Sequence, residues 1–202
     1  MTASIDFVFD FVSPNAYLAY WPLKEIAARH GTEIAFTPVL LGGMHKLTGN
    51  APPFVRDAEI KGKNAYAQLE MQRFIMRHAL DRFRMNPAFP FRSVDIQRML
   101  IAAQEQGRAV PYVEAMLRAV WEDALDVADE AAVAAVLGAA GFDAADLTAR
   151  ARNEAAKNTL AGNTEQAVER GVFGIPTFFV GQEMFFGKER LGQIDELLGE
   201  MA

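Results

Sequence analysis

The sequence predicts an α/β protein in which a small four-stranded mixed sheet is interrupted by a large all-helical insertion. Three observations predict this fold class. The chain opens with a strand–helix–strand pattern, continues with about a hundred residues that show only helical periodicity, and closes with a strand, a strand and a helix. The strands at the two ends can share one sheet, with the helical segment packed as a layer of its own.

The N-terminal part predicts two parallel strands joined by a helix. Residues 4–11 begin with apolar and polar side chains in alternation and are rich in β-forming residues, which is typical of a strand. Ser13-Pro14 then opens a segment whose apolar residues recur at helical spacing as far as His30-Gly31. Residues 33–39 alternate again, so a crossover helix connects two strands that run in the same direction.

Glycine and proline residues mark the change to helical structure. Gly42-Gly43 and the run 49–53 break the strand pattern, and only helical spacing follows. The alanine-rich composition of residues 130–156 favours helix by propensity alone. The predicted helices cover approximately residues 55–83, 93–107, 111–124, 129–140 and 143–170.

The C-terminal part predicts a β-hairpin and a closing helix. Residues 177–180 and 183–186 have strand character and are separated by Gly181-Gln182, and residues 189–201 have helical spacing. We expect this last helix and the helix over 15–30 to cover opposite faces of the sheet. The expected organisation is a discontinuous sheet domain, residues 1–41 and 172–202, with a helical insertion domain over residues 42–171.

The composition argues against several classes of protein. The 202 residues are 51% hydrophobic and 23% charged, which suits one globular domain carrying an insertion. A net charge of −6 disfavours nucleic acid as a partner, and no apolar run is long enough to span a membrane. The N-terminus lacks the basic residues of a signal peptide, so we expect a cytoplasmic protein. The chain has no cysteine, and its three histidines show no metal-binding spacing, so neither thiol redox chemistry nor a metal site is expected. The motifs of serine hydrolases and nucleotide-binding folds are missing as well.

Two short segments are candidates for function. Ser13-Pro14-Asn15 lies at a helix start, where free backbone N–H groups and the positive end of the helix dipole favour an anion. Ser13 either caps the helix only, or its hydroxyl also donates to a bound anion. Ile175-Pro176 precedes a strand; this proline is either purely structural or cis, in which case the peptide before it faces a ligand.

The order of these segments resembles the thioredoxin-like fold in its DsbA-type form. Members of that family carry Cys-x-x-Cys at the helix start, where this chain has Ser13-Pro14-Asn15-Ala16, a departure that removes dithiol exchange. A narrower resemblance, which covers nearly the whole chain, is to the 2-hydroxychromene-2-carboxylate isomerases and to their relatives, the kappa-class glutathione transferases. Its blocks are residues 6–14 with Tyr17-Leu18-Ala19, residues 40–43 with 49–53, residues 174–177, and residues 187–191.

The resemblance implies glutathione as cofactor and assigns residues to it. The serine that matches Ser13 sits beside the sulfur, where a helix start and a hydroxyl donor lower the pKa of a thiol. The backbone of Ile175, before Pro176, pairs with the cysteinyl peptide of the ligand. Asn50 matches an asparagine in the cleft. The segment that binds the γ-glutamyl end in the family is matched here by Phe186, Gly187, Lys188 and Glu189.

The same resemblance implies a substrate side of the cleft. Asn50 lines it, and either His45 or Lys46 takes the family's basic position there. Arg56 and Arg92 are candidates for gripping a substrate carboxylate, although most such arginines are solvated surface residues. Where relatives have a tyrosine near the substrate, this chain has residues 87–91, so a hydroxyl contact is missing. Aromatic rings that could stack on the substrate are Phe89, Phe91 and Phe186.

The implied activity is isomerisation of 2-hydroxychromene-2-carboxylate to trans-o-hydroxybenzylidenepyruvate, as in the catabolism of aromatic hydrocarbons. A glutathione thiolate adds to the conjugated carbon of the opened keto acid, the new single bond rotates, and the thiolate leaves. Two alternatives stay open: a kappa-like transferase that conjugates electrophiles, and a binding module without enzymatic activity on the same scaffold. The resemblance also implies a homodimer.

Overall fold

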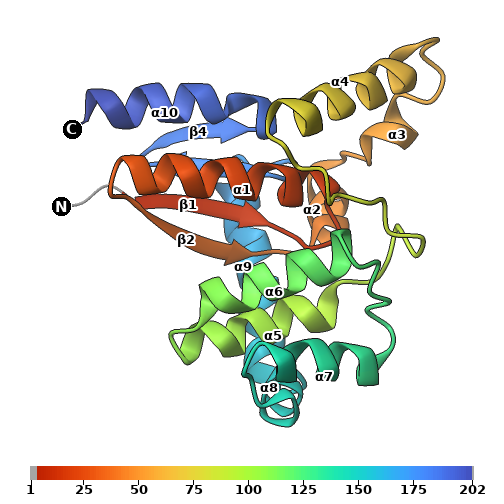
Figure 1. Ribbon diagram of the computed structural model, residues 1–202, viewed down its shortest axis with the longest axis vertical. Coiled ribbons are helices and arrows are strands. Elements are labelled where there is room, and N and C mark those ends of the chain that lie inside the picture. Colours follow the sequence, from red (N-terminus) through yellow and green to blue (C-terminus); the bar gives the residue numbers. More distant parts are fainter. Residues whose placement is uncertain (1–3, 202) are drawn as a thin grey trace.

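The computed structural model describes residues 4–201 and contains one mixed sheet (Figure 1). The strand order is β2-β1-β3-β4, with β1 parallel to β2, antiparallel to β3, and β3 antiparallel to β4. The predicted four-stranded mixed sheet is therefore confirmed. The strands are β1 (Ser4–Phe9), β2 (Glu33–Pro38), β3 (Thr177–Val180) and β4 (Glu183–Phe186).

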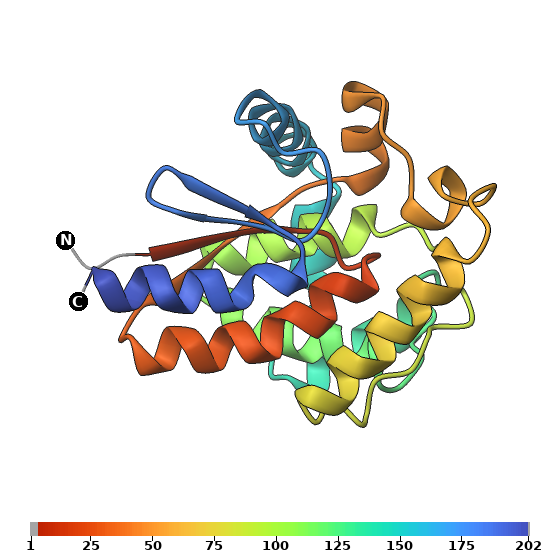
Figure 2. The same ribbon diagram turned by 90° about the horizontal axis from the view of Figure 1, so that it is seen from above.

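One expectation about the layers is wrong. Helices α1 (Pro14–Arg29) and α10 (Leu191–Glu200) lie side by side on the same face of the sheet, not on opposite faces (Figure 2). The other face is covered by α9 (Glu154–Glu169), which contacts β2 and packs beside α5 (Val94–Glu105). An apolar helix face shows that the helix covers something, but not which side of the sheet it lies on. Here the helical segment occupies the second face.

The helical segment is divided more finely than predicted. The expected helix over 55–83 is wrong: one helix ends at Arg56, Gly62 follows with a φ of 84° that favours glycine, and a second helix ends at Arg77. Residues 41–48 form a helix through Gly42-Gly43, which the sequence suggested as a break. The expected helices over 93–107, 111–124 and 129–140 are found with shifted ends. These helices are α2 (Leu41–Thr48), α3 (Pro53–Arg56), α4 (Lys63–Arg77), α6 (Ala109–Trp121) and α7 (Glu130–Ala139).

The predicted helix over 143–170 is also two helices. The chain breaks after α8 (Ala144–Ala151), and the side chain of Asn153 accepts a hydrogen bond from the backbone N–H of Ala156 to begin α9. Asparagine is among the preferred N-cap residues, so this break has a local cause in the sequence.

The core is built on the aromatic residues of the two central strands. The rings of Phe7 and Phe9 stack with centroids 4.9 Å apart, and Phe178 on β3 stacks on Phe7 at 5.1 Å. Tyr20 of α1 lies over Phe7, and all four side chains are buried. This packing holds α1 against the end of β1, so the helix start is fixed relative to the sheet.

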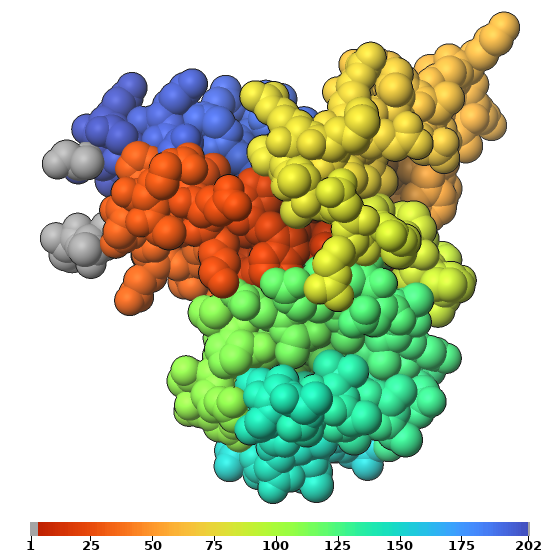
Figure 3. All heavy atoms as spheres, in the orientation of Figure 1, coloured from red at the N-terminus to blue at the C-terminus, as the bar shows by residue number. Residues whose placement is uncertain are grey.

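The segment α3–α4 projects from the body of the molecule (Figure 3). None of the residues of α4 is fully buried. Its outer side exposes Tyr66, Leu69 and Met76 at helical spacing. No helix in the described part of the chain is long and apolar enough to cross a membrane.

The far end of α1 is joined to α10 by two hydrogen bonds to the carboxylate of Asp195. His30 Nε2 and Arg29 Nη2 each lie 2.7 Å from a carboxylate oxygen of Asp195, and these hydrogen bonds, that of His30 first, lower the pKa of Asp195. A carboxyl group with a lowered folded-state pKa stabilises the fold above its unfolded pKa of about 3.9, and this stabilisation is lost as the pH falls through the folded-state value.

We therefore expect Asp195→Asn to lower the melting temperature slightly at pH 7. As the pH is lowered from about 5 to about 2, the melting temperature of the variant should fall less than that of the wild type. Thermal unfolding followed by circular dichroism over that range measures both. Exposed Glu154, which pairs only with Lys157 on its own helix, gives the control Glu154→Gln. Equal pH profiles for wild type and Asp195→Asn would contradict the prediction.

Candidate active site

Ser13 lies in a tight turn between β1 and α1. Its hydroxyl accepts a hydrogen bond from Ala16 N–H at 3.3 Å, so Ser13 is the N-cap of α1, followed by Pro14 in the first turn. The side chain is almost fully buried, with the residue 4% exposed. Because a serine hydroxyl carries one donor and two acceptor sites, capping leaves its O–H free to donate.

The segment Gly174–Thr177 lies beside that turn. Val8 pairs with Thr177, so the antiparallel register brings Phe9 and Pro176 together just beyond the last pair. The Ile175–Pro176 peptide is cis. Within residues 4–201, neither the N–H nor the C=O of Ile175 has a hydrogen-bond partner. Buried peptide groups are nearly always paired, so these two are available to a ligand.

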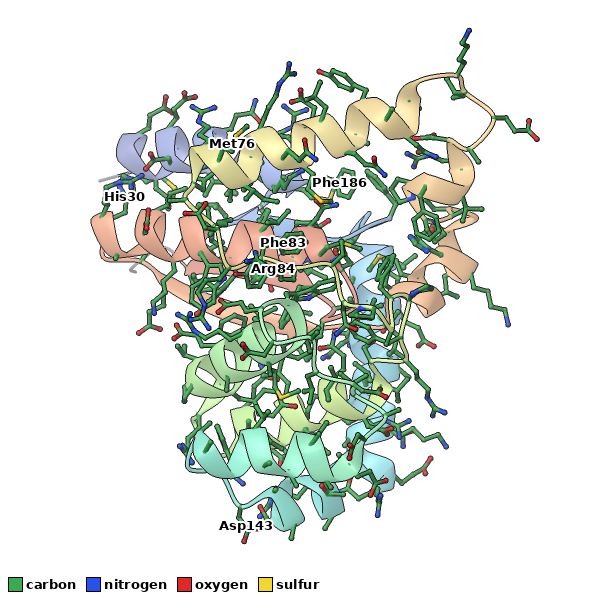
Figure 4. The ribbon with its side chains drawn as sticks, turned by 45° about the vertical axis from the view of Figure 1, so that its right-hand side comes forward. His30, Met76, Phe83, Arg84, Asp143 and Phe186 are labelled. Atoms are coloured by element: carbon green, nitrogen blue, oxygen red, sulfur yellow. The ribbon has the colours of Figure 1, made fainter. Side chains whose placement is uncertain are left out.

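The start of the last helical segment closes over this strand start. Gly187 N–H donates to Pro176 C=O at 2.9 Å, and Thr177 pairs with Phe186. The Phe186 ring covers Gly174 so closely that a Cβ at this glycine would lie 2.8 Å from it. Figure 4 shows Phe186 beneath α4 and at a distance from His30 at the far end of α1. Phe186, Gly187, Ile175 and Pro176, all predicted site residues, therefore form one cluster.

Asn50 connects this cluster to α3. Its Nδ2 donates to Phe173 C=O at 2.7 Å, and its Oδ1 accepts from Ala51 N–H and, at 3.4 Å, from Arg56 Nη1. The rest of the Arg56 guanidinium is bidentate on Asp57, whose pKa it lowers, with help from Lys63, to about 2. Arg56 therefore faces the cluster with one edge only.

The structure distinguishes His45 from Lys46. Lys46 is exposed, whereas His45 is half-buried near Arg56. Burial lowers the pKa of His45, and the positive charge of Arg56 lowers it further. Both effects favour the neutral form of the His45 ring.

The other predicted residues make contacts of their own, and Glu189 also reaches the cluster, because a Cβ at Gly187 would lie 2.9 Å from its Oε2. The side chains of Lys188 and Glu189 pair with each other and line a cavity of about 400 Å³ between α1, α4 and α10, and neither Ser13 nor Pro176 lines that cavity. Lys188 is buried, with its ammonium group 5.3 Å from the Phe74 ring centroid. Arg92 is exposed. Phe89 and Phe91 both pack on Trp121, and Phe89 also meets Phe54 with ring centroids 5.9 Å apart.

The fold and the cluster can be compared with known proteins. The family model of the DSBA-like thioredoxin domain matches residues 4–199. A 2-hydroxychromene-2-carboxylate isomerase from Sphingobium xenophagum is 32% identical over 200 residues, which are 98% of this chain and 99% of that protein. The chain belongs to the DSBA-like thioredoxin family, among the 2-hydroxychromene-2-carboxylate isomerases. It is therefore an enzyme of isomerase type.

Two further relatives agree with this placement. A solved structure of a 2-hydroxychromene-2-carboxylate isomerase superimposes with a TM-score of 0.85 at 28% identity, covering 98% of this chain and 95% of that one. Glutathione S-transferase kappa 1 from Homo sapiens is 26% identical over 215 residues, 98% of this chain and 91% of the relative. The resemblance seen in the sequence motifs is confirmed.

The residues that hold the Ser13 turn in place were not predicted. Asp10, Gln97 and Trp121 are buried polar side chains that bond to the backbone around it. A signal existed for Asp10 alone, because a charged residue between Phe9 and Phe11 interrupts a buried strand end. Gln97 and Trp121 lie on predicted helices, where nothing in the pattern separates them from other core positions.

The lowered pKa of His45 gives a prediction for this site. We expect Arg56→Gln to raise the pKa of His45 towards, but not up to, its ordinary value of about 6.5, because burial remains when the neighbouring charge is removed. Titration of the histidine ring protons by NMR measures the shift. His78 serves as an internal control, since burial and Arg77 lower its pKa and Arg56 does not act on it. A pKa of His45 that stays the same in the variant would contradict the prediction.

Proposed function

We propose that this isomerase uses glutathione to interconvert 2-hydroxychromene-2-carboxylate and trans-o-hydroxybenzylidenepyruvate, or a similar unsaturated aromatic keto acid. The observation that carries the proposal is the buried Ser13 hydroxyl at the start of α1, together with the unpaired peptide groups of Ile175, which the strand register places beyond the end of β1. The chain has no thiol of its own. The names of the isomerase relatives supply the substrate class.

The groups around Ser13 suit a peptide that carries a thiol. Ile175 offers one donor and one acceptor, the pattern by which an extended peptide adds to a strand. Asn15 Oδ1 is buried and has no hydrogen-bond partner among the described residues, so it can accept from a ligand N–H. The N–H groups at the start of α1 favour a negative charge. A cysteinyl peptide with an ionised sulfur satisfies all three features.

Each residue of the proposed site then has a role in the reaction. Bound glutathione supplies a nucleophilic thiol that adds reversibly to the conjugated carbon of the substrate. Ser13 donates its free O–H towards the sulfur position, and the start of α1 stabilises negative charge there. Asn50 holds the Phe173 backbone, and Phe186 shields the strand start from water.

The substrate side is proposed from the residues on and around α2 and α3. Neutral His45 donates a hydrogen bond to the keto acid, and the free edge of Arg56 attracts its carboxylate. Phe89 stacks on the aromatic ring. Lys46 and Arg92, both exposed, add positive charge at the rim. Lys188 and Glu189, already paired, take the charged γ-glutamyl end by exchanging partners.

Isomerisation of the chromene carboxylate, followed by absorbance with and without glutathione, tests the proposal. We expect turnover that needs glutathione and leaves its concentration unchanged. Turnover at the same rate in thoroughly dialysed protein without glutathione would rule out the cofactor, and no turnover with it would rule out the substrate.

The match to kappa-class transferases gives a second candidate function. A transferase would use the same bound thiol but form a stable conjugate with an electrophile. Incubation with glutathione and 1-chloro-2,4-dinitrobenzene separates the two functions, since an isomerase leaves that mixture nearly unchanged.

We also propose a homodimer and a cytoplasmic location. We further propose that the chain divides into a sheet domain, residues 1–41 and 172–202, and a helical insertion domain, residues 42–171. The exposed apolar side chains of α4 are the surface that we propose for the dimer contact. Sedimentation equilibrium with Tyr66→Glu, compared with the wild type, tests whether α4 takes part.

A further inference from the structure

The turn that carries Ser13 is held by side chains from distant parts of the chain. Phe9 C=O accepts from Gln97 Nε2 of α5 at 2.8 Å, and Phe11 C=O accepts from Trp121 Nε1 of α6 at 3.0 Å. Between these two residues stands Asp10, 1% exposed. A buried carboxyl group is costly unless it is hydrogen-bonded, so its partners indicate what it does.

The Asp10 carboxylate accepts hydrogen bonds from backbone N–H groups of two segments. Its Oδ1 accepts from Val12 N–H at 3.1 Å within the turn, and its Oδ2 accepts from Leu41 N–H at 2.9 Å at the first residue of α2. Burial raises the pKa of Asp10, and these two bonds and the nearby Ser93 side chain at the start of α5 oppose that rise. Backbone N–H groups can only donate, so this set of partners suits an acceptor-only carboxylate.

The backbone of Asp10 fixes Ser13 as well. Ser13 N–H donates to Asp10 C=O at 3.0 Å. Together with the bond from the side chain to Val12, this makes a turn of the kind in which aspartate bonds to the backbone two residues on. The place where α1 begins, and with it the position of the Ser13 hydroxyl, therefore depends on where Asp10 is held.

We propose that Asp10 is a positioning residue: its bonds to Val12 and Leu41 lock the Ser13 turn against α2, so that the Ser13 hydroxyl and the start of α1 point at the glutathione sulfur. The inference rests on the proposed use of glutathione. Asp10 touches neither cofactor nor substrate, being buried beneath the turn.

A positioning role and a direct electrostatic role of Asp10 predict opposite shifts in the pKa of the bound thiol when Asp10 is replaced. A negative charge three residues from Ser13 disfavours a nearby thiolate, so removing that charge alone would lower the pKa of the bound thiol. Asp10→Asn also places an amide NH₂ where Val12 N–H or Leu41 N–H needs an acceptor, which releases the turn. Under the proposal, displacement of the Ser13 hydroxyl raises the thiol pKa by more than loss of the negative charge lowers it.

The thiol pKa of bound glutathione can be measured directly, because the protein contains no cysteine and the ultraviolet absorbance of thiolate comes from the ligand alone. We expect Asp10→Asn to raise that pKa by about one unit and to lower kcat by about tenfold. Asp6→Asn is the matched control: Asp6 is on β1, the strand that ends just before Asp10, and it bonds to Thr37 and Arg170, away from the turn. It should leave both quantities unchanged.

Ser93→Ala extends the test to a variant that keeps the charge. It removes the hydroxyl that helps to keep the Asp10 carboxylate charged, and we expect a smaller rise of the thiol pKa in the same direction; this variant decides the matter if Asp10→Asn does not fold. An unchanged or lowered thiol pKa in the folded variant overturns the positioning role while the use of glutathione stands. A wild-type protein that does not lower the thiol pKa of glutathione overturns both.

Discussion

Replacing Ser13 with alanine is expected to lower the glutathione-dependent isomerase activity, as kcat/KM, by about 100-fold to 1000-fold, the usual cost of losing one donor to a developing or bound anion. At the start of α1, the Ser13 oxygen accepts a hydrogen bond from Ala16 N–H. This bond does not use the hydroxyl hydrogen, so the O–H is free to donate to the anion. The folded protein should also lose about 1 kcal/mol of stability, since the helix loses its cap.

A second cap separates these two effects. Asp143 caps α8 by accepting from Asp146 N–H at 3.0 Å, at the end of the molecule far from Phe186 (Figure 4). Asp143→Ala should lose a similar amount of stability in urea unfolding and keep full activity. If Ser13→Ala turned over as fast as the wild type with the same loss of stability, Ser13 would be a cap and nothing more.

The sequence predicted the sheet because short-range patterns determine it. The local signals are the alternation in residues 4–11 and 33–39 and the hairpin at Gly181-Gln182. The structure has the expected strands in all of these segments. The side of the sheet on which α10 lies is not a local property. It depends on which other helices compete for each face, so the expectation of opposite faces failed although both helices were found.

The candidate site shows the same division. Ser13, Ile175, Pro176, Phe186 and Gly187 were predicted from motifs, and the strand register brings their segments together. The pairing of Lys188 with Glu189 was not predictable, because it depends on α4 packing over Lys188, whose ammonium group lies near the Phe74 ring. The Gln97 side chain, 88 residues along the chain from the Phe9 carbonyl that it bonds, leaves no trace in spacing or composition.

The largest loss of stability is expected from Trp121→Ala, at about 3–5 kcal/mol, the range for removing a fully buried large aromatic side chain. Trp121 is 0% exposed, and the rings of Phe83, Phe89 and Phe91 lie with centroids 5.9–6.1 Å from its own. The variant would leave a cavity between α6 and the loop before α5. Chemical denaturation followed by circular dichroism measures the loss.

Two further variants divide that loss into packing and hydrogen bonding. Trp121→Phe keeps most of the ring contacts but leaves Phe11 C=O, which accepts from the indole N–H, without its partner, at a cost of about 1–3 kcal/mol. Trp21→Ala removes the other tryptophan, which is only half-buried under Arg118, and should cost less than Trp121→Ala. Because Phe11 belongs to the Ser13 turn, Trp121→Phe should also raise the KM for glutathione, whereas Trp21→Ala should not. Equal stability of the two alanine variants would show that Trp121 does not anchor the core at the turn.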